Sequence, residues 1–225
     1  PGYARTGRLQ PVLDEAGLAL ARARASRADT LWQGRATWEV VSMPDGFAPK
    51  SPTGWAIRDT LTARVHPRQA SAALATAIRA AGGDIVTEAA DQGAVVWANG
   101  WQGLSDLSEH LGRKVGDGVK GQAILLRFDA RNAPQLFVDG LHVVPHGDGT
   151  VAVGSTSERG FDRPDTVDAQ CDALLDKARW AVSVLTGAPE LQRWAGVRPR
   201  ARSRAPLLGA WPGRDGHFVA NGGFK

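Results

Sequence analysis

Apolar side chains recur every three or four residues in four stretches of the chain, which is the spacing of one face of an α-helix. In the clearest stretch, Pro67 stands in the first turn, where a helix tolerates proline, and a Gly-Gly pair beginning at Gly82 follows where glycine ends a helix. In the longest, Pro164 precedes Asp165 and Asp168, whose carboxylates favour the first turns of a helix. The predicted helices are residues 12–28, 67–81, 104–111 and 164–186.

Between these helices lie short apolar or alternating runs that predict β-strands. The run 94–98 (AVVWA) is apolar throughout, so we expect it to be buried on both faces. The Asp148-Gly149 pair predicts a hairpin turn between the last two of these strands. The predicted strands are residues 37–42, 85–86, 94–98, 123–128, 141–145 and 150–155, with a loop at 44–54 and turns and short strands, but no helix, at 194–225.

Strands separated by helices favour parallel pairing, and strands joined by a hairpin pair antiparallel. The sequence therefore predicts an α/β (mixed α+β) protein, woven from two substructures in alternating segments. Its 225 residues are 43% hydrophobic and 22% charged, which excludes a disordered, collagen-like or low-complexity chain. No apolar run approaches the roughly 18 residues of a membrane span, and no secretory pattern stands at the start.

Three further features bear on where and how the protein works. The single cysteine, Cys171, cannot form an internal disulfide and lies on the apolar face of a predicted helix, so we expect a structural thiol in a reducing, cytoplasmic compartment. The excess of arginine over lysine, with much alanine, indicates a GC-rich bacterial genome. The chain lacks an initiator methionine and stops at Lys225 without a closing element, so we expect a piece of a longer protein.

Several motifs invite a function that their context does not support. Residues 116–121 (GDGVKG) match the spacing of a dinucleotide-binding loop, but a helix precedes them and a strand follows, which is the reverse of that loop's setting. Ser155 lacks the spacing of a nucleophile elbow. His142 and His146 straddle a strand and its turn, without a further metal ligand nearby, so we expect no metal site.

Two residues carry the candidate chemistry. Arg198 follows Trp-Ala-Gly-Val, and a guanidinium in such an apolar setting is best accommodated by an anion, a carboxylate above all. His142 is an imidazole in an otherwise apolar strand, and a satisfied core histidine is the competing interpretation. Arg198, Arg200, Arg202 and Arg204 alternate and would share one face of a strand, as either a solvated edge or a row of phosphate contacts.

Seven short segments stand in a specific order and spacing over nearly the whole chain. They are Gly2–Gly7, Val65–Pro67, Ala94–Trp101, Lys120–Gln122, Leu141–Pro145 with Val153–Glu158, Trp194–Pro199 and Gly216–Gly223. Together they resemble the motifs of the FAD-dependent amine and amino-acid oxidoreductases of the D-amino acid oxidase and glycine oxidase family.

The resemblance implies an FAD-binding Rossmann-like domain interleaved with a substrate domain that has a mixed or antiparallel sheet. By the same resemblance, residues 1–62 and 113–190 belong to the substrate domain, and residues 63–112 and 191–225 to the FAD-binding domain. The implied cofactor is FAD. The implied reaction oxidises the C–N bond of an amino acid or related amine by hydride transfer to the flavin, with oxygen or another acceptor taking the electrons.

The resemblance also implies roles for particular residues. Arg198 would clamp a substrate carboxylate, and His142 would contact the carboxylate or the amine. Residues expected near the cofactor are Ala98, Gly100, Trp101, Gly121, Gln122, Gly222 and Gly223. No nucleic-acid partner, membrane span or metal is implied, and the oligomeric state stays open.

The chain departs from the family pattern at several places. The GxGxxG segment that grips FAD is absent and is expected before Pro1, and the stretch 83–94 is short. His142 stands where the family often has a tyrosine, and Ser203-Arg204 where an acidic residue and a glycine are common. These departures leave the substrate open. Two alternatives remain: a folded module without flavin, and a basic domain that binds nucleic acid through Arg198 to Arg204.

Overall fold

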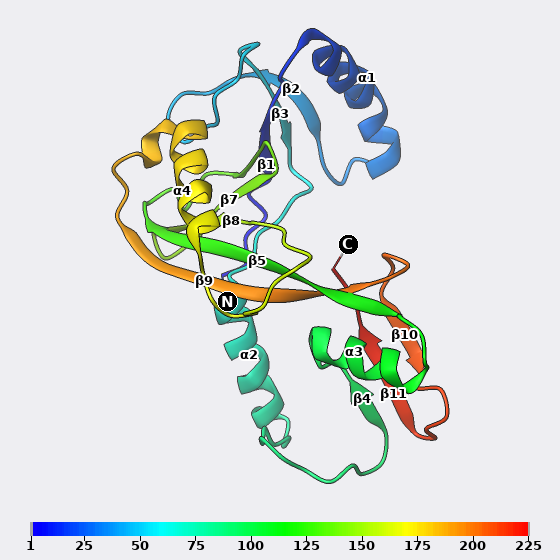
Figure 1. Cartoon of the computed structure of the whole chain (residues 1–225). Helices are drawn as coiled ribbons and strands as arrows, with labels where there is room; N and C mark the ends of the chain where they lie inside the picture. Colours follow the sequence, from blue (N-terminus) through cyan, green and yellow to red (C-terminus); the bar gives the residue numbers. More distant parts are fainter. Residues whose placement is uncertain (1, 225) are drawn as a thin grey trace. The chain divides into compact units, whose positions relative to one another are not determined.

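The computed structural model describes residues 2–224 and divides into two compact units that share the chain in alternating segments (Figure 1). The first unit comprises the residues up to Ile85, Ala123–Ser155 and Asp168–Arg193. The second comprises Val86–Gln122, Thr156–Val167 and the residues from Trp194 on. This is the mixed α+β, interleaved architecture that the sequence predicts, and each unit is described by itself below.

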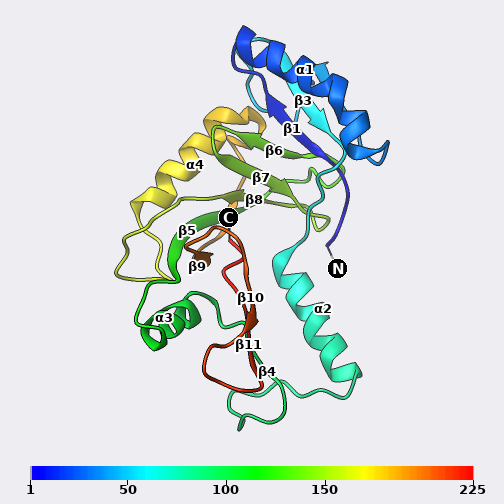
Figure 2. The ribbon, with the colours of Figure 1, turned by 90° about the vertical axis from the view of Figure 1, so that its right-hand side faces the viewer.

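The first unit is built on a mixed sheet with the strand order β2-β3-β1-β6-β7-β8-β5-β9. Strand β1 pairs antiparallel with β3 and parallel with β6, and the other registers within the unit are antiparallel. Figure 2 shows β6, β7 and β8 side by side. The bounds are Arg8–Pro11 (β1), Trp38–Ser42 (β2), Trp55–Asp59 (β3), Gly116–Arg127 (β5), Gln135–Val138 (β6), Leu141–Pro145 (β7), Thr150–Gly154 (β8) and Glu190–Ala201 (β9); β5 and β9 continue into the second unit.

The helices of the first unit are α1 (Glu15–Trp32), α2 (Pro67–Ala80), α4 (Ala169–Ala181) and the 3-10 helix Ser183–Leu185. The Asp14 carboxylate caps α1 by accepting from the Gly17 N–H at 2.6 Å, and Asp168 caps α4 in the same way. Helix α1 packs Leu18 and Ala21 against Ile57 of the sheet. Helix α4 buries Cys171, Leu174, Leu175, Ala178 and Ala181.

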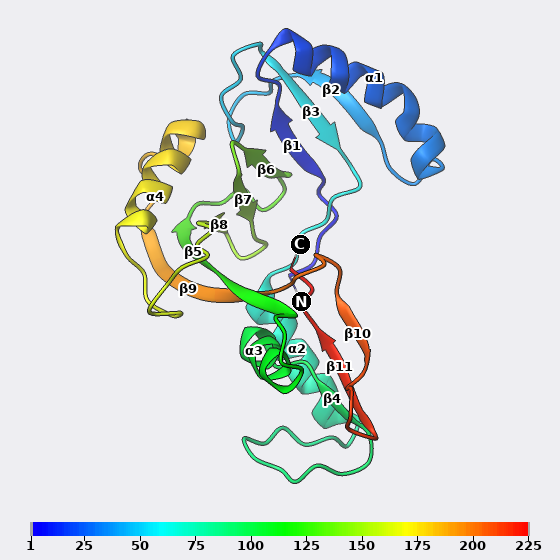
Figure 3. The ribbon, with the colours of Figure 1, turned by 45° about the vertical axis from the view of Figure 1, so that its right-hand side comes forward.

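The second unit contains a three-stranded sheet of order β10-β11-β4, with helix α3 beside it (Figure 3). Its elements are β4 (Val95–Trp97), α3 (Gly100–His110), β10 (Leu207–Ala210) and β11 (His217–Asn221). Strand β11 pairs antiparallel with β10 and parallel with β4. Its small core gathers Leu107 of α3, Val219 of β11 and Trp211, with Trp97 and Leu207 packed against them.

Most of the predicted elements are confirmed. The helix from Pro67, the helix before Gly112, the hairpin 141–154 and the helix-free last stretch all occur as expected. The segment GDGVKG lies inside β5, so it is not a dinucleotide-binding loop. Cys171 is fully buried, and desolvation raises the pKa of its thiol, as a structural cysteine requires.

Several predictions were wrong. Residues 85–86 form no strand, and their side chains are exposed. Strand β4 is an edge strand and not buried on both faces, because Val96 is 59% exposed. Helix α4 begins at Ala169 rather than at Pro164, because Asp168 is its cap. Arg202 and Arg204 follow the end of β9, so the four arginines do not share one strand.

The sequence also left three strands unpredicted: β1, β3 and β6. The first unit's sheet depends on them, since β1 joins β3 on one side to β6 on the other. The domain boundaries implied by the resemblance stay a prediction; the two compact units divide the chain at other residues.

Candidate active site

Two parallel strands of the second unit bring candidate cofactor residues to one edge. Strands β4 and β11 are neighbours, with Val95 opposite His217 and Trp97 opposite Val219. The carboxyl ends of parallel strands meet at the same edge, which is where open α/β sheets bind dinucleotides. Gly100 follows β4, and Gly222 follows β11. The Asn221 side chain ties the two ends together, donating from Nδ2 to the Gly100 carbonyl at 2.8 Å.

Both glycines at this edge are required by the backbone. Gly100 has a φ of 70° and Gly222 a φ of 71°, in the left-handed region that favours glycine. A Cβ on Gly222 would also lie 2.8 Å from the Cβ of Ala201. Helix α3 begins at Gly100, and no side chain caps its amino end. This edge therefore offers bare backbone and a helix amino end, which fit a phosphate-bearing cofactor.

Arg198, the predicted carboxylate clamp, lies flat against the backbone of β5. Its guanidinium donates to three main-chain carbonyls, those of Val119 at 3.3 Å, Lys120 at 3.1 Å and Thr156 at 2.9 Å. Gly121 provides the space, since a Cβ there would lie 2.7 Å from Arg198 Nη2. The Arg198 guanidinium is therefore held by backbone carbonyls and lies against Gly121.

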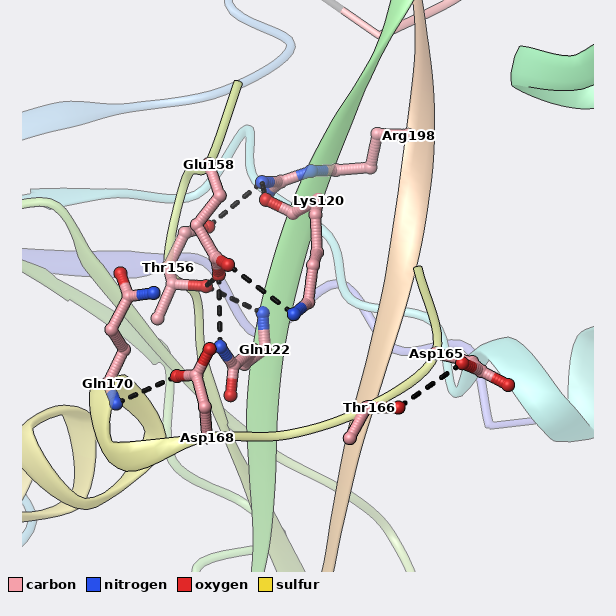
Figure 4. A network of polar contacts seen from close by, with 9 residues as sticks. All are labelled: Lys120, Gln122, Thr156, Glu158, Asp165, Thr166, Asp168, Gln170 and Arg198. Carbon is pink, nitrogen blue, oxygen red and sulfur yellow. Dashed lines mark hydrogen bonds and ion pairs between the residues drawn. The ribbon is translucent and has the colours of Figure 1, made fainter. Parts of the chain in front are cut away.

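A buried ion pair stands beside this arginine (Figure 4). Lys120 Nζ lies 3.5 Å from Glu158 Oε2, and the two side chains are only 5% and 9% exposed. Glu158 Oε1 accepts from Gln122 Nε2 at 3.1 Å and from the Thr156 hydroxyl at 2.5 Å. Lys120 and Glu158 also exchange two backbone hydrogen bonds of 2.9 Å, so the pair is fixed at both main chain and side chain.

Glu158 is ionised in this network, and Arg198 adds a second positive charge to that of Lys120. Burial by itself raises the pKa of Glu158, but hydrogen bonds from Thr156 and Gln122 and the charge of Lys120 outweigh it and hold the pKa below its ordinary value. Burial lowers the pKa of the Arg198 guanidinium, and Glu158 partly offsets that effect. Because an arginine titrates so far above neutral pH, Arg198 stays cationic. The site thus presents a fixed positive charge next to an ionised carboxylate.

The arginine and the strand-end glycines belong to one neighbourhood of the second unit. Gly223 forms a bridge with Arg200, and the Phe224 N–H donates to the Pro199 carbonyl at 3.1 Å. The ring of Phe224 lies 4.5 Å from the Arg198 Cζ. The segment after β11 therefore runs beside the end of β9.

The other predicted site residues are placed as follows. Trp101 packs edge-on against Phe161, and Ala98 is exposed after β4. Gln122 is fully buried, and its side chain belongs to the Glu158 network. The cofactor roles of these residues stay predictions.

His142 belongs to the first unit, whereas Arg198 belongs to the second. It lies on the exposed side of β7, opposite Phe137 of β6 and Gly154 of β8, with its ring 4.8 Å from that of Phe137. Partial desolvation lowers the pKa of His142, and the positive charge of Arg8 lowers it further. The imidazole is therefore neutral at neutral pH. His142 is not the buried core histidine of the competing interpretation.

Sequence reasoning missed three side chains of this site. Lys120, Thr156 and Glu158 stand in the quoted motifs KGQ and TSE, yet none was selected as a site residue. Their lysine–carboxylate pairing becomes visible only when β5 meets the segment after β8. A buried charge of each sign in two paired motifs is the signal that would have found them.

Within residues 2–224, no cluster of three histidine, cysteine or acidic side chains could hold a metal ion. Within the same residues, no helix is long and apolar enough to cross a bilayer.

Comparison with known proteins decides the family. The family model described as FAD dependent oxidoreductase (DAO) matches residues 1–225, the whole chain. The chain belongs to the DAO family. FAD is therefore the cofactor that its family membership implies, and the bare strand ends at Gly100 and Gly222 fit that cofactor.

Curated relatives of this DAO-family chain include two glycine oxidases. The enzyme of Pseudomonas putida is 34% identical over 140 residues, which are 61% of this chain and 37% of that protein. The enzyme of Pseudomonas aeruginosa is 34% identical over 109 residues, which are 48% of this chain and 30% of that protein. The chain thus matches about a third of the length of each relative.

Solved structures share the fold of the DAO-family chain. Glycine oxidase from Geobacillus kaustophilus has a TM-score of 0.77 at 22% identity, covering 99% of this chain and 66% of that one. Iminodiacetate oxidase from Chelativorans sp. BNC1 has a TM-score of 0.81 at 20% identity, covering 99% and 68%. At these identities the likeness establishes the fold, and the predicted fold class is confirmed.

Proposed function

We propose that this chain is part of an FAD-dependent enzyme that oxidises the C–N bond of an amino acid or a related amine. The substrate loses a hydride from its α-carbon and a proton from its nitrogen, and water converts the resulting imine to a carbonyl compound and a free amine or ammonia. FAD, when bound, would supply the two-electron redox chemistry, with oxygen or another acceptor as the final oxidant. Membership of a family of FAD-dependent oxidoreductases supports this proposal.

The carrying observation is the seating of Arg198. Arg198 donates to three backbone carbonyls and lies against Gly121. Its guanidinium is therefore oriented before any substrate arrives. A pre-oriented guanidinium of this kind can attract a carboxylate and so fix where the α-carbon lies. The Lys120–Glu158 pair stabilises the backbone around Gly121, because Lys120 precedes Gly121 on β5 and is bonded to Glu158 through both its side chain and its main chain.

His142 is proposed as the second substrate contact. Its neutral imidazole, on the exposed side of β7, can accept a hydrogen bond from an ammonium or a proton from it. Glycine is the first substrate to test, because both curated relatives are named glycine oxidase. The proposal includes a cytoplasmic location, which the single, buried Cys171 supports.

The experiment replaces Arg198 in the full-length protein and follows flavin reduction without oxygen, with glycine and other amino acids. Arg198→Ala is expected to lower kcat/KM about 30- to 5000-fold, the effect of removing a buried partner of a charged group. Arg202→Ala is the matched control, since it removes an exposed arginine from the turn after β9.

Two outcomes would contradict the proposal. If Arg198→Ala keeps the kcat/KM of the control, Arg198 is not the carboxylate clamp. If the full-length protein binds no FAD, the module without flavin is the better description. Retained FAD together with loss of activity in Arg198→Ala alone supports the proposal.

A further inference from the structure

A buried arginine in the first unit lacks a counter-ion. Arg64, just before α2, is only 7% exposed. Its Nη2 donates to the Arg131 carbonyl, but its Nε and Nη1 are buried without a hydrogen-bond partner among residues 2–224. No carboxylate within those residues forms a salt bridge with it. Burying a guanidinium whose Nε and Nη1 donate no hydrogen bond is unfavourable unless an acceptor lies against them.

Two histidines accompany this arginine. The rings of His66 and His146 have centroids 4.4 Å apart, and His146 is 4% exposed. The Nδ1 atom of each ring is buried and has no partner among the described residues. An imidazole nitrogen donates when it carries a proton, so both rings can add donors to those of Arg64.

The two nearby aspartates, Asp148 and Asp129, do not neutralise Arg64. Asp148 Oδ2 lies 3.6 Å from His66 Nε2, beyond hydrogen-bond distance, and Asp148 accepts from Thr150 through its other oxygen. Asp129 is paired with Arg131. Arg64 supplies fixed donors, and an imidazole adds donors when it is protonated, so this cluster suits an anion better than a metal ion.

We propose that Arg64, His66 and His146 bind a small inorganic anion of the size of chloride. The anion accepts from the unused guanidinium N–H groups and from protonated imidazole, and it neutralises the buried charge. The site lies wholly within the first unit. It contains no residue of the Arg198 network and does not depend on the proposed function.

Binding is expected to strengthen as the pH falls. The pKa of His146 is lowered by burial first, then by the charges of His66 and Arg64, while Asp148 opposes the shift. A bound anion favours the protonated imidazole of His146, so it lifts this pKa back and binds more tightly at about pH 6 than at about pH 8. Arg131 and Asp129 pair with each other and leave this direction unchanged.

The test measures chloride binding to the full-length protein from the broadening of the chloride NMR line, at constant total ionic strength. We expect a saturable, bromide-competed signal that grows as the pH falls. Arg64→Gln should weaken the affinity at least about tenfold. The matched control is Arg58→Gln, because Arg58 is an exposed arginine of the same unit, on β3.

Should Arg64→Gln fail to fold, His146→Gln replaces it, with an expected loss of about threefold and of the pH dependence. Bromide soaked into crystals should give an anomalous peak beside Arg64 Nε. The proposal is overturned if the wild-type protein shows no saturable signal, or if the site variant and the control bind chloride equally.

Discussion

Replacing Gly121 by alanine tests whether the position of the Arg198 guanidinium matters, whereas removing Arg198 tests only whether the residue matters. The added Cβ would stand 2.7 Å from Arg198 Nη2 and 2.8 Å from Cζ, whereas ordinary contacts begin near 3.4 Å. The guanidinium must therefore move by about 0.7 Å. Its Nη2 holds the Lys120 and Thr156 carbonyls at 3.1 and 2.9 Å, and a shift of that size weakens both bonds.

The expected loss follows from those bonds. A hydrogen bond from a charged donor contributes about 1.5–3 kcal/mol. If Arg198 loses one of these two hydrogen bonds, kcat/KM should fall about 10- to 150-fold. The reason is that the guanidinium no longer orients the substrate carboxylate. The free energy of unfolding should fall by no more than about 3 kcal/mol, the contribution of one such bond, because the end of a flexible side chain can give way and alanine suits a strand better than glycine.

The assay combines flavin reduction kinetics with thermal unfolding of the full-length protein. Gly196→Ala is the control, because Gly196 lies on the same β9 strand as Arg198 and a Cβ there meets nothing within 4 Å. The reasoning is refuted if Gly121→Ala and Gly196→Ala have the same kcat/KM. It is also refuted if Gly121→Ala lowers the activity only in proportion to a loss of folded protein.

Two further predictions concern the neighbours of this seat. Because the pKa of Glu158 is lowered in the folded state, its stabilisation is present above about pH 4.5 and is lost as the pH falls through the folded pKa. Glu158→Gln should therefore destabilise the protein by about 3 kcal/mol at neutral pH, because it removes the carboxylate that pairs with the buried Lys120. It should also make the unfolding free energy less dependent on pH in the acid range. Glu39→Gln on β2 should have neither effect. Asn221→Ala, by freeing the Gly100 carbonyl, should weaken FAD binding about tenfold in a fluorescence titration, and unchanged affinity would contradict the assignment of this edge to the cofactor.

The sequence motifs by themselves identify much of the candidate site. Arg198 stood out because a charged residue interrupted an apolar run, and the structure places it on Gly121, a residue of the same resemblance. The glycines at 100 and 222 were selected for close approach, and both have a positive φ. Local chemistry was enough here because each feature depends on a few consecutive residues.

The same motifs do not predict which residues form ion pairs or which strands are neighbours. Glu158 looks like any acid after a strand until the segment it belongs to pairs with Lys120. Likewise β1 and β6 are too short to show a period, and they are strands because each completes the hydrogen bonds of its neighbours. Residues 85–86 show the converse, because an apolar pair without a partner strand stays exposed.

The sequence by itself determined the helices, the hairpin at Asp148-Gly149, the interleaved α/β class and the family, since spacing, turn chemistry and motif order are properties of the linear chain. The tertiary structure decided which charges are buried and with whom. It paired Lys120 with Glu158, gave Arg198 three carbonyls and left Arg64 without a carboxylate. Burial and charge balance depend on residues brought together from distant segments, and these are contacts that no local pattern encodes.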